Sequence, residues 1–320
     1  MLNRRILRIK AFKVLYSFAE DPSMTLAEGE SQLETSCEAT RSLYLFMLSI
    51  IPALADEALS RIEAAKGKFN PTEEERNPNM KFACNALAAK FREDPDFVKA
   101  VNRRKLSWDQ FDAFIRNTYS SILSKDYFAD YMGAEGSDLK QDIKLYTKIF
   151  EEEFVDSKEL SDILEDLSIW WNDDLAYSLT CCCDSLRLMA HGKGWELPPL
   201  YRSEMAPSGE KDSDKAFVTR LLRTSFLCFE KYAPLVAENA EQWEGDRLFT
   251  TDLALIVMGL SEAKAFPEMP VRVTINEYVE ISKYYSTPKS RVFVNGMLDR
   301  LIRKLVAEGE IEKTEIIEIQ

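Results

Sequence analysis

The sequence predicts an all-α protein. Apolar residues recur at spacings of three and four through most of the 320 residues, runs that alternate apolar and polar residues are few, and the composition, 46% hydrophobic and 30% charged, is that of an ordinary folded chain. Two stretches rich in Pro, Gly and charge, 66–79 and 191–214, interrupt this pattern. We therefore expect N-terminal helices at 1–65, a helical insertion with its linkers at 66–210, and a C-terminal subdomain at 211–320.

The expected helices follow directly from the apolar spacing. In chain order they lie within 4–20, 30–65, 81–130, 140–190, 215–240, 250–265, 275–285 and 289–306. The longest apolar run, residues 43–55, is too short to cross a bilayer and contains Pro52, so it predicts a buried helix. The first residues lack the continuous apolar stretch of a secretory signal. We expect a cytoplasmic protein with no membrane association.

The chemistry-bearing residues favour binding over catalysis. The chain has one histidine, His191, and six cysteines without a C-x-x-C pair; Cys181, Cys182 and Cys183 are adjacent, so they point to different faces of a helix. No glycine-rich phosphate loop, H-E-x-x-H or G-x-S-x-G motif occurs. We predict buried cysteines, no metal site, no cofactor and no enzymatic activity.

The C-terminal third carries the clearest local signals. Thr274 and Glu277 have the spacing of a capping box, which predicts a helix start there, and Thr287 before Pro288 predicts another. The stretch "VFVNGML" is ambiguous, because its Asn-Gly pair is a common hairpin signal. The apolar spacing continues beyond Gly296, which favours a helix.

The first helix is basic in a chain whose formal net charge is -13. In "MLNRRILRIKAFKVLY", Arg4, Arg5 and Arg8 fall within about 100° of one helix face, and Lys10 and Lys13 lie to another side. Positive side chains near a helix N-terminus oppose the helix dipole, so folding alone does not favour them there. The three arginines therefore predict a cationic patch that binds phosphate groups. The alternative is an exposed helix end with charges that have no ligand.

A second group of cations surrounds the start of the last helix. Lys289 and Arg291 precede Phe293, and three more cations follow within three turns: Arg300, Arg303 and Lys304. Single-stranded RNA stacks its bases on aromatic rings while cations follow the backbone. Phe293 either serves as such a ring or packs into the core, since helical aromatic residues usually point inward.

Three stretches carry a resemblance to a known family. They are "RRILRIKAFKVLYSF", "QWEGDRLFTTDLAL" and "INEYVEISKYYSTPKSRVFVNGMLD", within 4–18 and 217–303. The first is similar to an arginine-rich helix ending in Leu-Tyr, and the last to an I-N-E…A-K…S…F-V-N-G-x-L-D signature. The chain resembles the NusB family of bacterial transcription antitermination factors, in an enlarged form with a long internal insertion.

The resemblance implies a fold and a task. It implies a NusB-like helical bundle of two packed subdomains. It also implies pairing with NusE, a small-subunit ribosomal protein, to bind boxA-type RNA in nascent ribosomal RNA transcripts as part of the RNA polymerase antitermination complex. Tyr16 matches a position near the NusE interface. The RNA-binding positions that we expect are Arg4, Arg5, Arg8, Lys10, Lys289, Arg291 and Phe293.

The sequence departs from the family in the helix after Asp252. Family members commonly have Leu-Arg and then Tyr-Glu, where this chain has Ile256 and Val257 and then Ser261 and Glu262. The arginine and the tyrosine are lost, which affects the expected partner surface. The alternative function is a helical protein-interaction scaffold that has lost RNA binding, with the insertion as its working surface.

Overall fold

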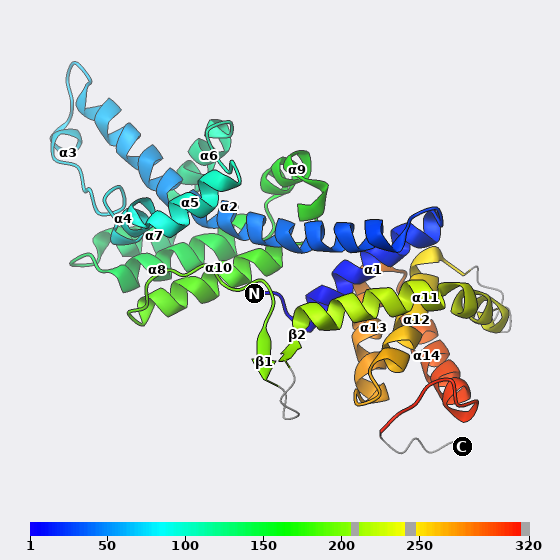
Figure 1. Cartoon of the computed structure of the whole chain (residues 1–320). Coiled ribbons are helices and arrows are strands. Elements are labelled where there is room, and N and C mark those ends of the chain that lie inside the picture. Colours follow the sequence, from blue (N-terminus) through cyan, green and yellow to red (C-terminus); the bar gives the residue numbers. More distant parts are fainter. Residues whose placement is uncertain (206–210, 241–247, 315–320) are drawn as a thin grey trace. The chain divides into compact units, whose positions relative to one another are not determined.

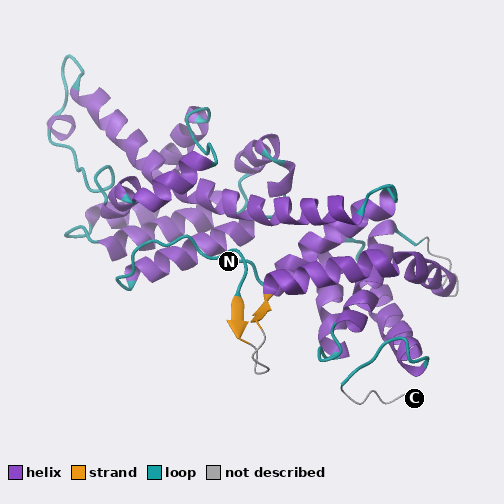
Figure 2. Cartoon of the chain, viewed as in Figure 1, coloured by secondary structure: helices purple, strands orange, loops and turns teal. Residues whose placement is uncertain are grey.

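The computed structural model describes residues 1–205, 211–240 and 248–314. In this part of the chain the regular secondary structure is helical apart from one short pair of antiparallel strands, which confirms the all-α class (Figures 1 and 2). The chain forms two compact units: Met1–Cys37 with Leu200–Gln320, here called the core unit, and Glu38–Pro199, here called the inserted unit. The expected domains, 1–65, 66–210 and 211–320, stay a prediction.

The core unit brings the two ends of the chain together in one helical bundle. The long helix α2 begins in this unit and continues into the next. The elements, in chain order, are α1 (Arg4–Glu20), the start of α2 (Leu26–Lys66), the antiparallel strands β1 (Ser203–Met205) and β2 (Lys211–Ser213), α11 (Asp214–Ala240), α12 (Thr250–Ala265), α13 (Val271–Tyr285) and α14 (Ser290–Ala307).

The inserted unit is built from shorter helices around the second part of α2. Where the apolar pattern predicts helix through 81–130, the structure has several short helices. The elements are α3 (Glu73–Arg76), α4 (Ala86–Glu93), α5 (Pro95–Arg103), α6 (Asp112–Leu123), α7 (Asp126–Gly133), α8 (Leu139–Ile149), the π-helical η1 (Phe150–Phe154), α9 (Lys158–Leu167), the 3₁₀ turn η2 (Ile169–Trp171) and α10 (Leu175–Ala190).

Helix α12 is the centre of the core unit. Four consecutive residues, Leu255 to Met258, are fully buried, and because consecutive residues of a helix point to all of its sides, the helix is covered all round. The covering helices are α1, α11, α13 and α14 (Figure 1). A Cβ atom at Gly259 would lie 2.6 Å from Leu298, so this glycine permits the close approach of α14. Ile256 and Val257, which replace the family's Leu-Arg, are therefore core residues.

Aromatic side chains and capped helix ends organise the inserted unit. The rings of Phe46 and Trp108 stack at 4.0 Å, and the Trp108 indole donates a hydrogen bond to the Phe46 carbonyl. The buried Asp142 carboxylate accepts hydrogen bonds from the Ala86 and Leu87 amides, which caps α4. The unit thus has a core of its own.

Among the described helices, α2 is long and apolar enough to cross a membrane by length and composition, and 61% of its most apolar window is buried within the protein. The core helix of a soluble protein passes the same test. The buried helix predicted at 43–55 is confirmed, and Pro52 lies inside it. Proline in a helix interior removes one backbone hydrogen bond but does not prevent burial of the surrounding apolar side chains.

The helix starts predicted near the C-terminus are wrong by a few residues. Helix α13 begins at Val271, after Pro270, so Thr274 does not cap it, and the Thr274 hydroxyl instead donates to Glu262. Helix α14 begins at Ser290 rather than after Thr287. The prediction of a helix rather than a hairpin through "VFVNGML" is confirmed.

The cysteines are free thiols, as expected of small apolar side chains. Burial of this kind is confirmed for Cys37, Cys182, Cys183 and Cys228 but is wrong for Cys84, which is exposed in the turn before α4. The thiol of Cys182 donates to the Tyr44 carbonyl, and burial raises its pKa well above the usual value. It is therefore unreactive at neutral pH.

Candidate nucleic-acid interface

The first turn of α1 places two arginines at the protein surface. The Asn3 side chain accepts a hydrogen bond from the Ile6 amide at 3.0 Å, which caps the helix just before Arg4. The Arg4 side chain is 40% exposed and its Nε lies 3.1 Å from Asp214. Its guanidinium carbon also lies 4.9 Å from the Phe217 ring centre. A packed ring and a carboxylate thus hold Arg4 in place, while part of its charge faces solvent.

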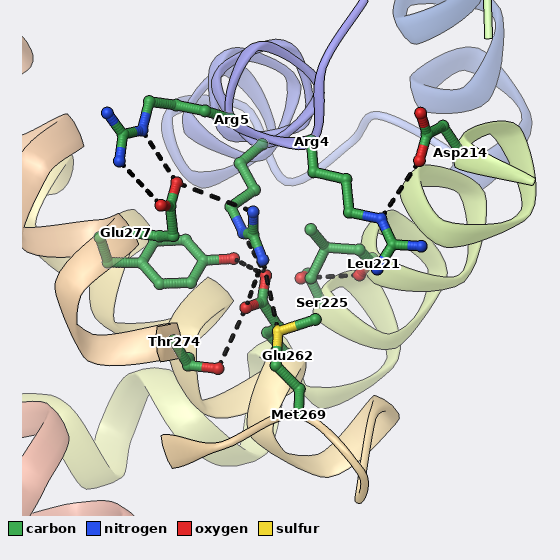
Figure 3. A network of polar contacts seen from close by, with 11 residues as sticks. Arg4, Arg5, Asp214, Leu221, Ser225, Glu262, Met269, Thr274 and Glu277 are labelled. Carbon is green, nitrogen blue, oxygen red and sulfur yellow. Dashed lines mark hydrogen bonds and ion pairs between the residues drawn. The ribbon is translucent and has the colours of Figure 1, made fainter. Parts of the chain in front are cut away.

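Arg5 is the more exposed of the two. Its side chain is 51% exposed, and it donates two hydrogen bonds to Glu277, at 2.9 and 2.8 Å (Figure 3). The hydrogen bonds from Arg5 hold the pKa of the Glu277 carboxyl below its usual range, and Glu277 raises the Arg5 pKa in return. Arg5 is therefore a fixed, half-exposed positive charge.

Arg8 lies in a buried network with Glu262. Two hydrogen bonds join them, at 2.7 and 3.0 Å, and their side chains are 4% and 0% exposed. Glu262 also accepts from the hydroxyls of Thr274 and Tyr278, each at 3.0 Å (Figure 3). Both carboxylate oxygens are thus satisfied, which is the condition for a tolerable buried ion pair.

The charge states in this network follow from its geometry. Burial lowers the Arg8 pKa, but the hydrogen bonds and negative charge of Glu262 outweigh burial, so the pKa is raised. Burial together with the charge of Glu262 raises the Tyr278 pKa well above its usual value, so its phenol keeps its proton and donates. The network joins α1 to α12 and α13, and its role is structural.

The predicted surface patch on α1 therefore does not include Arg8 or Lys10. Both side chains are buried, at 4% and 1% exposed. The reason is helix periodicity: Arg8 shares a face with Phe12 and Leu15, which pack into the core, and Lys10 lies among buried Leu7 and Ala11. RNA contact by the other predicted residues stays a prediction.

The second predicted cluster lies at the surface. Lys289 and Arg291 are exposed at the start of α14. Phe293 is half-buried, so its ring is neither fully exposed for stacking nor fully packed in the core. A buried carboxylate fixes this loop: Asp252 accepts from the hydroxyls of Ser286 and Ser290 at 2.6 and 2.8 Å. No local pattern indicates this role of Asp252, because its partners lie more than thirty residues away in the sequence.

The far end of α1 meets the α13–α14 connection. The rings of Phe12 and Tyr285 lie 5.5 Å apart, and the Lys13 ammonium lies 5.6 Å from the Tyr285 ring centre. Tyr16 is 36% exposed on the same helix, and Tyr284 is 81% exposed. Sequence reasoning missed Tyr284 and Tyr285, although two adjacent tyrosines at a helix end are a recognisable signal.

The arrangement is suited to binding anions. Among the described side chains, no group of three or more His, Cys, Asp or Glu is placed to hold a metal ion. The half-exposed or exposed cations, Arg4, Arg5, Lys289 and Arg291, stand out on a chain with a formal net charge of -13. They are candidate contacts for phosphate groups, which the acidic remainder of the protein repels.

Comparison with known proteins identifies relatives of the core unit. A model described as the NusB family matches residues 197–303. The transcription antitermination protein NusB of Salinibacter ruber is 34% identical over 115 residues, which is 36% of this chain and 72% of that protein. NusB of Thermodesulfovibrio yellowstonii is 31% identical over 102 residues, 32% of this chain and 68% of the relative. No solved structure matches the chain.

Proposed function

The chain belongs to the NusB family, and from that premise we propose that it is a transcription antitermination factor that pairs with NusE and binds boxA-type RNA in nascent ribosomal RNA transcripts. In this proposal it acts in the cytoplasm within the RNA polymerase antitermination complex. It binds RNA and protein without catalysis, without a cofactor and without a membrane.

The observation that carries the RNA proposal is the pair of half-exposed arginines at the start of α1. Arg5 keeps 51% of its side chain exposed although it is hydrogen-bonded to Glu277. A guanidinium held in one orientation loses little conformational freedom when it binds a phosphate bidentately. The rest of the acidic surface repels RNA, so binding is local and salt-sensitive.

We assign the predicted residues according to their burial. Arg4, Arg5, Lys289 and Arg291 contact phosphates, and Phe293 stacks a base through its exposed side. Arg8 holds α1 against α12 and α13 and thereby positions Arg4 and Arg5 on the same helix. Lys10 is buried and therefore does not contact RNA.

We assign NusE binding to the other end of α1, at Tyr16. An exposed tyrosine offers a large apolar ring with a polar tip, the kind of residue that is enriched in protein interfaces. We expect the full chain to co-purify with NusE at micromolar concentration, and Tyr16→Ala to weaken the complex about tenfold because interface tyrosines commonly contribute more than 1 kcal/mol. The control is Tyr201→Ala, which removes a half-buried tyrosine of the core unit whose hydroxyl donates to Glu34 at 3.1 Å. Absence of a complex with the unaltered chain would contradict the proposed partner.

The carboxylate of Asp214 competes with RNA for Arg4. Asp214→Asn keeps the size and polarity of the first side chain of α11 but removes the charge that holds Arg4 at 3.1 Å. We expect RNA affinity to rise about two- to fivefold, because a partly exposed ion pair contributes up to about 1 kcal/mol. Anisotropy titration with labelled boxA RNA measures the change.

The control for this variant is Glu57→Gln, which removes one negative charge from an ion pair with Arg61 in the inserted unit. Glu57→Gln changes the net charge by the same amount as Asp214→Asn but does so away from Arg4. An equal gain in affinity for both variants would show that total charge, and not release of Arg4, sets RNA binding.

A further inference from the structure

A cavity of about 620 Å³ lies in the inserted unit, lined mainly by α7 and α8. This volume is typical of small-molecule sites, which span roughly 300 to 1,000 Å³. Its walls are largely apolar and include Tyr127, Tyr131, Ile143 and Leu145. The cavity lies outside residues 197–303, the part that matches the family, so family membership assigns it no role.

Lysines edge this apolar cavity. Lys140, Lys144 and Lys148 line it from α8 and are spaced four residues apart, so they lie along one helix face. Lys148 is paired with Glu152 at 2.7 Å. Among the described residues, neither Lys140 nor Lys144 has an ion-pair partner within 4.0 Å. These two lysines are available to a ligand.

Other charged groups at the cavity leave a positive balance. Arg187 of α10 also lines it but is paired with Asp184 at 2.7 Å. Asp130 and Glu151 line it as well, and they oppose the four cations. A net positive cavity is unexpected on a chain with a formal net charge of -13, and it is complementary to an anion.

The tyrosines contribute neutral rings. Tyr131 donates its hydroxyl to Asp142 at 2.7 Å and Tyr127 to Glu153 at 3.0 Å. Burial first, and then these carboxylates, raises the pKa of both phenols, so they stay protonated. With their polar ends engaged elsewhere, their rings provide apolar, aromatic wall for a flat ring system.

We propose that this cavity binds a nucleoside phosphate, with its base against Tyr127 and Tyr131 and its phosphates beside Lys140 and Lys144. The apolar aromatic wall matches the base, and the two lysines without an ion-pair partner match the phosphates. An anion without a ring uses only the lysines, and a nucleoside without phosphate uses only the wall.

The test is calorimetric titration of the full chain with ADP and GDP, with adenosine and inorganic pyrophosphate as partial ligands. We expect at least one of the two nucleotides to bind, and both partial ligands to bind at least about tenfold more weakly than that nucleotide. Lys144→Glu should weaken nucleotide binding by at least about tenfold, because it reverses a charge beside the phosphates. Lys99→Glu, an exposed lysine on α5, makes the same charge change away from the cavity and should leave binding unchanged.

A second variant, Ala134→Trp, fills the cavity from its exposed edge and should abolish binding without touching a lysine. Unchanged melting temperatures of the variants show that they fold. Three results each overturn the proposal: no binding of either nucleotide at about 1 mM, pyrophosphate binding as tightly as the better nucleotide, or equal effects of Lys144→Glu and Lys99→Glu.

Discussion

Arg8→Ala and Glu262→Ala, made separately, are each expected to destabilise the core unit by about 3 to 5 kcal/mol, the cost of leaving one charge of a buried ion pair without its partner. Arg8 and Glu262 are 4% and 0% exposed and joined by two hydrogen bonds, so neither water nor salt compensates for the loss. In the Arg8→Ala variant, Glu262 retains only the hydroxyls of Thr274 and Tyr278.

The measurement is native-state hydrogen exchange at the amides of α12. These amides report on the core unit alone, whereas a melting curve of the whole chain mixes two compact units. The control is the double variant Arg8→Met with Glu262→Leu, which removes both charges. Its free energy of unfolding should be closer to that of the unaltered protein than that of either single variant. A loss of less than about 1 kcal/mol in both single variants is the behaviour of an exposed pair and would contradict the burial of Arg8 and Glu262.

Arg4→Gln with Arg5→Gln is expected to weaken boxA RNA binding by about a hundredfold. Hydrogen bonds to charged groups each contribute about 1.5 kcal/mol or more, and about 1.4 kcal/mol corresponds to a tenfold change in affinity. Stability should fall less than on breaking the buried Arg8 pair, because the Arg4 and Arg5 side chains are 40% and 51% exposed, although their partners Asp214 and Glu277 are mostly covered, at 8% and 18%. Glutamine keeps the polar stem and avoids placing a new carboxylate beside Glu277.

The helices could be predicted from the sequence because each one carries its own apolar spacing. The last helix is the clearest case: the spacing continues past Gly296, and it outweighs the local Asn-Gly hairpin signal. Helix starts were less predictable, because the Thr274 hydroxyl is used by Glu262 and not by its own helix. The local capping pattern was present, but the Thr274 side chain forms a tertiary hydrogen bond instead of the local one.

The site was predictable only in part, for a related reason. The sequence indicated a basic first helix, but it could not indicate which cations have buried partners, because Arg8 meets Glu262 across 254 residues of chain. The buried face of α1 was visible in Phe12 and Leu15, and Arg8 lies on it. No local pattern indicated that Asp214 and Glu277 hold Arg4 and Arg5, because charged residues on helices usually face solvent.

The salt dependence of boxA RNA binding tests whether the start of α1 binds RNA. Labelled RNA is titrated with the chain and NusE at several salt concentrations, using the unaltered protein, Arg4→Gln with Arg5→Gln, and Lys99→Gln with Arg103→Gln as a control of equal charge on α5. We predict that the first variant alone loses affinity and that its log–log salt slope is shallower by about 1.4, since each phosphate contact to a single strand contributes about 0.7. An affinity and a slope equal to those of the unaltered protein would contradict the claim.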